Sequence, residues 1–246
     1  MFVRATFDAH SVSARNCGLV YGLPSPSAWM GFVHAWCLQA HLIDRLVPGV
    51  TPIVRQFAIN GFHDGFGRVN FALPRCTERD SVGGTQLDAP TAFFSGGVIF
   101  ELDINEDDKE GTMVSLTQAL LFMKFAGGAI VDPELKTFDT LDLARKTIGF
   151  TLQEEPIPES EASLLDRLLD HVTPQKGKKG WCMPSLMGYR AIEELASNRP
   201  GARGGYRHAY ADPLIGVVRA VGLSRTSNIP RWDWYHSPPF VLFKTI

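Results

Sequence analysis

The stretch from Tyr21 to Ala40 constrains the fold more than any other part of the chain. A Gly/Pro turn leads into Ser25 and Pro26, an order typical of a helix start. The Ser25 hydroxyl can accept from a free backbone N–H of the first turn, and Pro26 needs no N–H there. Apolar residues then recur at helical spacing: Trp29, Phe32, Val33, Trp36, Cys37 and Ala40. The stretch therefore predicts a helix that buries one face in the core, with His34 off that face.

The same helix start has a second interpretation. A helix that begins in a fixed turn exposes backbone N–H groups, which suit an anion such as phosphate. The plainer alternative is an ordinary, well-capped core helix. Local spacing leaves both open.

Strands and a second helix are predicted around this stretch. The predicted strands are residues 2–7, 52–59, 68–73, 92–104 and 129–131. A second amphipathic helix is predicted at 112–125. The order strand, helix, strands, helix, strand predicts an α+β fold class with a ferredoxin-like βαββαβ core, as in RNA-recognition modules. We expect residues 1–135 to form this core, and residues 136–246 to form a C-terminal β and loop extension packed on it in one continuous domain.

Composition and charge narrow the function classes. A hydrophobic fraction of 45% is typical of a globular protein, and the formal net charge of −2 does not indicate a nucleic-acid binder. Residues 176–246, however, carry eleven basic and four acidic side chains, a net charge of +7. This imbalance favours a local electropositive surface, and the alternative is a solvated face without a partner.

Cysteine usage and hydropathy predict a cytoplasmic protein. The four cysteines are far apart in the chain: Cys17, Cys37, Cys76 and Cys182. Such spacing is typical of reduced thiols and not of a zinc site or a disulfide framework. We expect no signal peptide and no membrane span, because no apolar run approaches the required length.

Arginines and aromatic residues are interleaved in the C-terminal third. This combination suits single-stranded RNA, because guanidinium groups neutralise phosphates and rings stack on unpaired bases. The most specific part of this pattern is the Gly-rich run 199–208, which contains Arg203, Arg207 and His208. Its alternative interpretation is a disordered surface loop. Trp181 and Trp234 are expected in the core, since tryptophan buries well.

Gly127 and Gly128 follow the second predicted helix. Without side chains they would let the backbone approach another chain closely. Their alternative interpretation is a helix C-cap. The seven histidines are scattered, and no metal-binding motif is present. We therefore expect neither a metal nor a cofactor, and interpret His34 as structural or as an RNA contact.

Four stretches in series resemble one known family. Residues 24–35 (Pro-Ser-Pro, then Gly-Phe-Val-His-Ala) are the most specific. Residues 125–130 (Phe-Ala-Gly-Gly-Ala-Ile), 180–189 (Gly-Trp-Cys-Met-Pro, then Gly-Tyr) and 234–236 (Trp-Tyr-His) follow in order. Together they resemble the Cas-five-type member of the RAMP superfamily, the second Csy subunit of type I-F CRISPR surveillance complexes. The chain is shorter than typical members of that family.

The resemblance implies a non-catalytic subunit that binds the 5′ handle of the guide RNA. Its implied partners are the Cas-seven-type backbone subunit and the large subunit or its substitute, and a contact with target DNA through the protospacer-adjacent duplex stays open. The candidate RNA-binding residues are Arg15, Asn16, Ser25, Ser27, His34, Gly127, Gly128, Arg190, Arg203, Arg207, His208 and Arg225. The alternative is a metal-independent endoribonuclease of the same fold, with a histidine and a tyrosine or lysine cutting at a 2′-OH.

Overall fold

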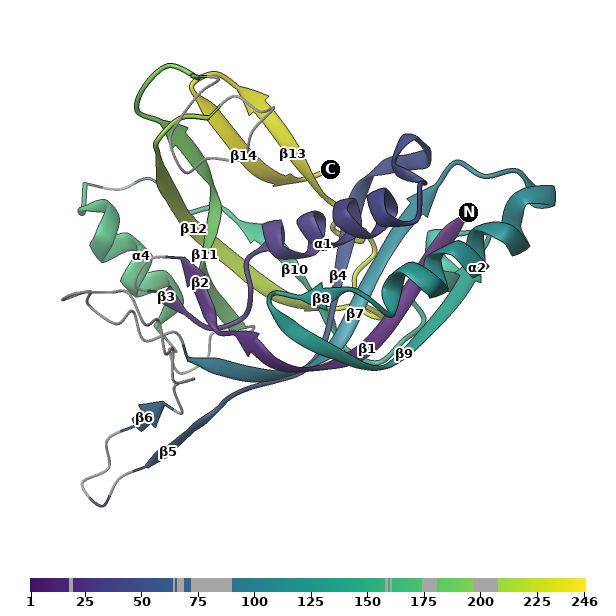
Figure 1. The fold of residues 1–246 in the computed structure, drawn as a ribbon. Helices are drawn as coiled ribbons and strands as arrows, with labels where there is room; N and C mark the ends of the chain where they lie inside the picture. Colours follow the sequence, from purple (N-terminus) through teal and green to yellow (C-terminus); the bar gives the residue numbers. More distant parts are fainter. Residues whose placement is uncertain are drawn as a thin grey trace, which may run out of the picture.

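The computed structural model describes residues 1–17, 20–63, 65, 69–71, 90–157, 159, 161–173, 181–196 and 208–246. Within these ranges, ten strands form one antiparallel sheet in the order β10-β12-β11-β14-β13-β4-β7-β1-β9-β8 (Figure 1). These strands are β1 Phe2–Ser13, β4 Leu46–Ile59, β7 Thr91–Leu102, β8 Lys124–Phe125, β9 Gly128–Phe138, β10 Phe150–Glu155, β11 Trp181–Ala191, β12 Ala211–Gly222, β13 Trp232–Ser237 and β14 Phe240–Thr245.

Two small strand pairs and several helices complete the described elements. The small pairs are β2 Arg15–Cys17 with β3 Val20–Tyr21, and β5 Gly61–His63 with β6 Val69–Phe71. The helices are α1 Pro26–Gln39, α2 Lys109–Leu120, α3 Leu141–Ala144 and α4 Leu164–Val172, with 3₁₀ turns η1 Ile43–Arg45 and η2 Glu106–Asp108. In the part of the chain described, no helix has the length and apolarity needed to cross a membrane.

The predicted ferredoxin-like α+β fold class was wrong. The first strand, both helices and the strands near 52–59, 92–104 and 129–131 do form, as β1, α1, α2, β4, β7 and β9. They do not close a compact βαββαβ unit, because the sheet continues through β4 into β13 and the strands beyond it. β4 is fourteen residues long and pairs with β7 on one side. Its other edge has backbone groups that need partners, and strands of the C-terminal half supply them.

The C-terminal strands close into a ring together with β4. β10 pairs with β12 and, at Phe150 opposite Val54, with β4. In the described strands, β4, β13, β14, β11, β12 and β10 therefore form a ring of pairings. The fully buried Trp232 donates its indole N–H to the Leu152 carbonyl at 2.7 Å and so ties β13 to β10. A buried tryptophan needs such a partner for its one donor.

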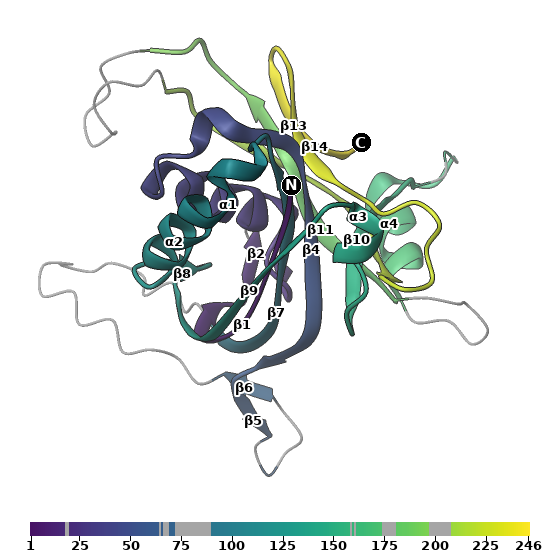
Figure 2. The same ribbon diagram turned by 90° about the vertical axis from the view of Figure 1, so that its right-hand side faces the viewer.

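Helix α1 is the centre of the main core. α1 and α2 cover one face of the sheet, and α3 lies on the other (Figure 2). The rings of Trp29 and Phe125 lie 5.2 Å apart, and those of Trp36 and Phe100 lie 5.3 Å apart. Both indole N–H groups on α1 are satisfied: Trp29 donates to the Gly97 carbonyl at 3.1 Å and Trp36 to a carbonyl of α2 at 2.9 Å. The predicted apolar face of this helix is confirmed.

Candidate nucleic-acid interface

The four stretches that carry the family resemblance all meet around α1. The first stretch is largely α1 itself. Phe125, in the second, packs on Trp29 and on Phe32, whose ring centroid is 5.6 Å away. The third stretch, in β11, is hydrogen-bonded to Asn16 of β2, ahead of α1 in the chain. Trp234 of the fourth lines a pocket with His34 of α1. The four stretches are thus far apart in sequence but close together in the fold.

Two exposed rings lie on either side of the buried Phe243. Tyr189 on β11 lies 6.0 Å from Phe243, and Trp234 on β13 lies 5.1 Å from it, both edge-on. Tyr189 is 39% exposed and Trp234 is 40% exposed, whereas Phe243 is buried. We call Tyr189 and Trp234 the aromatic surface. Part of each ring is open to solvent while its other contacts fix its position, which suits base stacking.

The expectation that Trp181 and Trp234 belong to the core was wrong. Trp181 is 49% exposed at the start of β11, where its ring meets Phe150 edge-on at 6.0 Å. Phe243 and Trp232 occupy the buried positions that Trp234 was expected to share. Alternation along β13 would have placed Trp232 and Trp234 on one face, but not shown that the core ends between them.

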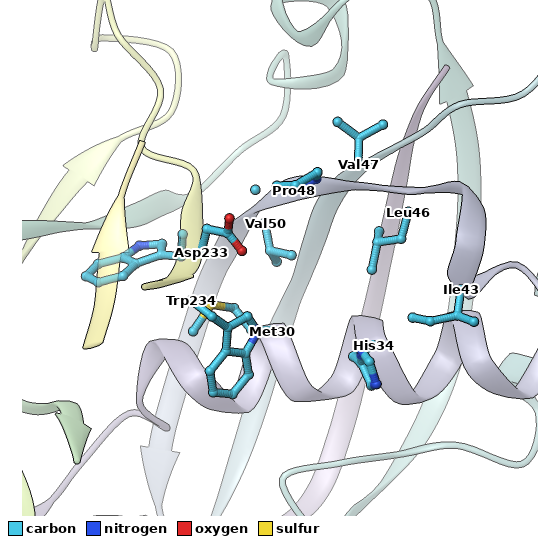
Figure 3. A pocket seen from close by; sticks show the side chains of 11 residues that line it. Met30, His34, Ile43, Leu46, Val47, Pro48, Val50, Asp233 and Trp234 are labelled. Carbon is cyan, nitrogen blue, oxygen red and sulfur yellow. The ribbon is translucent and has the colours of Figure 1, made fainter. Parts of the chain in front are cut away.

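A pocket opens beside the aromatic surface, between α1, β4 and β13. Its volume is about 220 Å³. Figure 3 shows Met30 and His34 along α1, with Trp234 and Asp233 from β13 and Val50 from β4. The Asp233 carboxylate would oppose a phosphate, but a carboxylate can accept from the amino groups of a base. The pocket is therefore chemically suited to a base edge rather than to the RNA backbone.

The Asn16 side chain is buried and links two segments of the fold. Its amide donates to the Leu23 carbonyl at 2.7 Å and to Ser185 Oγ at 3.2 Å. Its oxygen accepts from the Leu186 N–H at 2.8 Å. The side chain thus joins the turn before α1 to β11. We assign Asn16 to the scaffold of the interface, not to the RNA contact for which the sequence nominated it.

Replacing Asn16 by alanine is expected to lower the free energy of unfolding by about 1–3 kcal/mol, because it leaves the buried Leu186 N–H unpaired. Urea denaturation followed by fluorescence measures this change. Asn105→Ala, at an exposed asparagine without a side-chain capping bond, is the control and should change stability by less than about 0.5 kcal/mol. Equal effects for the two variants would contradict the scaffold role.

The start of α1 differs in one detail from its prediction. Ser25 is the N-cap and Pro26 stands in the first turn, as expected, but the Ser25 side chain makes no capping bond. Its hydroxyl instead pairs with the Ser27 hydroxyl at 2.7 Å, and Ser25 is buried. The two serine hydroxyls hydrogen-bond to each other, so the prediction that the Ser25 hydroxyl accepts from a backbone N–H of the first turn was wrong. Of the two, Ser27 keeps partial exposure.

Gly127 and Gly128 do not cap a helix. α2 ends at Leu120, and Ala126 and Gly127 form the turn of the β8–β9 hairpin, with φ of 44° and 83°. Positive φ at both central residues is the requirement of a type I′ turn. Gly127 is exposed with open space around it, but a Cβ on Gly128 would lie 2.7 Å from the His10 carbonyl oxygen. Gly128 is therefore needed for close strand packing, and only Gly127 can face a ligand.

The remaining candidates lie in several separate elements. Arg190 is exposed at the end of β11, next to Tyr189. Arg15 in β2 is half-buried, and His208 forms an isolated bridge with Ala196. Arg225 lies elsewhere, in the turn after β12, where it lines a second cavity near α3. Arg203 and Arg207 fall outside the described residues.

Two further observations concern metal-binding groups and a buried thiol in the described part of the chain. Among the described residues, no group of three His, Cys, Asp or Glu side chains is placed to hold a metal ion. Burial raises the pKa of the Cys37 thiol on α1 to about 12, so this cysteine stays neutral and unreactive at neutral pH. Sequence reasoning counted Tyr189 and Trp234 among the aromatic residues of the basic C-terminal third, but it nominated neither as an RNA contact and expected Trp234 in the core.

Comparisons with known proteins add no family assignment. No protein-family model matches this chain, and no curated protein matches it. The likeness to the Cas-five-type family therefore stays a prediction from the four stretches.

Proposed function

We propose that the protein is a non-catalytic RNA-binding subunit of a type I-F-like CRISPR effector complex in the cytoplasm. It caps the 5′ handle of the guide RNA, contacts the Cas-seven-type backbone subunit and the large subunit or its substitute, and presents the spacer for pairing with target DNA. Base pairing by the guide then supplies the sequence recognition. The observation that carries the proposal is the convergence of all four family-like stretches around α1.

The aromatic surface gives the proposal a physical basis. Tyr189 on β11 and Trp234 on β13 offer two ring faces, with β14 between these strands. Arg190 is exposed too, but it follows Tyr189 in β11 and so lies on the opposite face of the strand. Unpaired bases stack on such rings for roughly 1–3 kcal/mol each. The pocket with His34 and Asp233 lies next to this surface and can take the edge of one base.

Replacing Tyr189 and Trp234 together by alanine is expected to weaken binding of a handle-length single-stranded RNA by about 30-fold or more, since two stacking contacts are lost. Fluorescence anisotropy with labelled RNA measures the change. Phe122→Ala is the control, because Phe122 is 80% exposed in the turn after α2 and away from this surface. Binding that is the same for the double variant and the control would contradict the assignment of this surface.

Identifying the RNA tests the function itself. The full chain is coexpressed with a CRISPR repeat–spacer transcript and the other effector subunits, and the RNA that copurifies is sequenced. The proposal expects one 5′ handle, protected and not cut by this chain. Specific cutting of a repeat RNA by the purified chain in EDTA would instead favour the endoribonuclease alternative. Recovery of no RNA with the assembled complex would contradict the proposal.

A further inference from the structure

A second and larger cavity lies near α3, on the sheet face opposite α1. Its volume is about 650 Å³. Two segments form it: the loop of residues 146–149 before β10, and residues 222–225, which begin at the last residue of β12. Lys146 and Arg225 bring two exposed cations to it, and Ser224 and Thr147 bring hydroxyl groups. No carboxylate belongs to the described residues that line it.

The two loops are held in place by the fold. The Leu223 N–H donates to the Gly149 carbonyl at 3.3 Å, and the Arg145 guanidinium donates to the Thr226 carbonyl. Gly149 has a φ of 136°, and a Cβ there would lie 2.7 Å from the Val54 carbonyl oxygen. A glycine is therefore required where the first loop meets β4. The cavity is built on fixed backbone rather than on a free surface loop.

Two further arginines hold the first loop and add to its positive charge. Arg4 donates to the Ala144 carbonyl at 2.9 Å and to the Lys146 carbonyl at 3.1 Å, and Arg55 donates to Thr147 Oγ1 at 3.2 Å. Burial lowers the pKa of the Arg4 guanidinium; the Glu134 carboxylate raises it and the charge of Arg55 lowers it further.

Two carboxylates near these cations are engaged in ion pairs. Asp142 pairs with Arg145 at 2.9 Å, and Glu134 pairs with Lys136 at 2.6 Å. Lys146 and Arg225, which face the cavity, carry no ion pair with the other described residues. The positive charge at the cavity is therefore not cancelled locally, which favours an anion.

From this geometry we infer a phosphate-binding site between Lys146 and Arg225, with the backbone phosphate of a single-stranded nucleic acid as its ligand. Lys146 and Arg225 neutralise the phosphate, and Ser224 donates a hydrogen bond to its oxygens. The inference rests on the proposed function for the nature of the strand, and adds a contact on the face opposite the aromatic surface. Ile148, 85% exposed at the cavity rim, offers an apolar contact for the sugar and base.

The test compares the full chain with its Lys146→Ala plus Arg225→Ala variant. A labelled 12-nucleotide oligouridine RNA is titrated at several salt concentrations between 50 and 200 mM. Loss of two phosphate contacts is expected to weaken binding about tenfold and to flatten the log–log salt slope by about 1.4. Arg45→Ala plus Lys109→Ala removes the same charge from η1 and the start of α2, and is expected to leave the slope near that of the unaltered chain.

A second probe, inorganic pyrophosphate titrated by calorimetry, separates a free phosphate ligand from a strand. Pyrophosphate binding that is lost in the Lys146/Arg225 variant, with RNA binding unchanged, keeps the phosphate site and assigns it to free phosphate compounds. If both probes bind the variant and the Arg45/Lys109 control equally, or if neither probe binds the unaltered chain, the inference is overturned. RNA binding that survives in the variant with an unchanged salt slope overturns the strand contact and leaves the proposed function standing.

Discussion

Replacing Gly97 by alanine is expected to lower the free energy of unfolding by more than about 4 kcal/mol, or to prevent folding. A Cβ at this position would lie 1.9 Å from the Ala5 carbonyl oxygen and 2.8 Å from the Thr6 Cα. Both atoms belong to the backbone of β1, which pairs with β7 at this point, so no side-chain movement can relieve the contact. The carbonyl group of Gly97 also accepts the Trp29 indole bond, so a shift of β7 would disturb α1 as well.

Gly31→Ala is the matched control for this change. Gly31 lies in α1 and is exposed, and a Cβ added there would meet nothing within 4 Å. Alanine there is expected to raise stability by about 0.5–1 kcal/mol, because glycine has more backbone freedom to lose in a helix. Thermal and urea unfolding of both variants measure the contrast. A Gly97→Ala protein as stable as the Gly31→Ala protein would contradict the close approach of β1 and β7.

Replacing Trp29 by alanine is expected to cost about 3–5 kcal/mol of unfolding free energy. The indole is fully buried, with Phe125 and Phe94 at ring-centroid distances of 5.2 and 6.0 Å. Its removal leaves a cavity between the helix and the sheet, and it also leaves the buried Gly97 carbonyl without its donor. Equilibrium urea denaturation, with the midpoint and slope fitted together, measures the loss.

Two further variants divide the Trp29 effect into its parts. Trp29→Phe keeps an aromatic ring but removes the N–H donor, and is expected to have an intermediate effect. Leu38→Ala, on the exposed side of the same helix, should change stability by less than about 0.5 kcal/mol. A loss for Trp29→Ala no larger than that for Leu38→Ala would mean that α1 is not the centre of the core.

Residue spacing and turn residues predicted most of the individual helices and strands in the N-terminal half of the chain. The spacing of Trp29, Phe32 and Trp36 is enough to define α1 and its buried face, and Pro26 marks its start. The strand near 92–104 was found within two residues at either end, as Thr91–Leu102. The second helix was predicted too long, since it ends at Leu120. Its end depends on the β8–β9 turn, which the glycines alone did not distinguish from a helix cap.

The candidate site was less accessible to sequence reasoning. Asn16 was nominated for RNA together with Arg15, as part of a long polar connection, yet it bonds Ser185 and Leu186, which follow it by more than 160 residues. Trp234 was assigned to the core because of its residue type, yet Phe243 takes the buried place beside it. Both outcomes depend on which strand lies next to which, and no local pattern encodes that choice.

Residue order alone was thus sufficient for α1, for its apolar face and for the strands that flank it, because period and turn chemistry act over a few residues. Tertiary structure alone decided that β4 would pair with β13 and β10, that the sheet would extend to ten strands among the described residues, and that Lys146 would meet Arg225. The physical reason is that a strand edge can pair with any other strand. The partner is selected by the summed burial and hydrogen bonding of the whole chain.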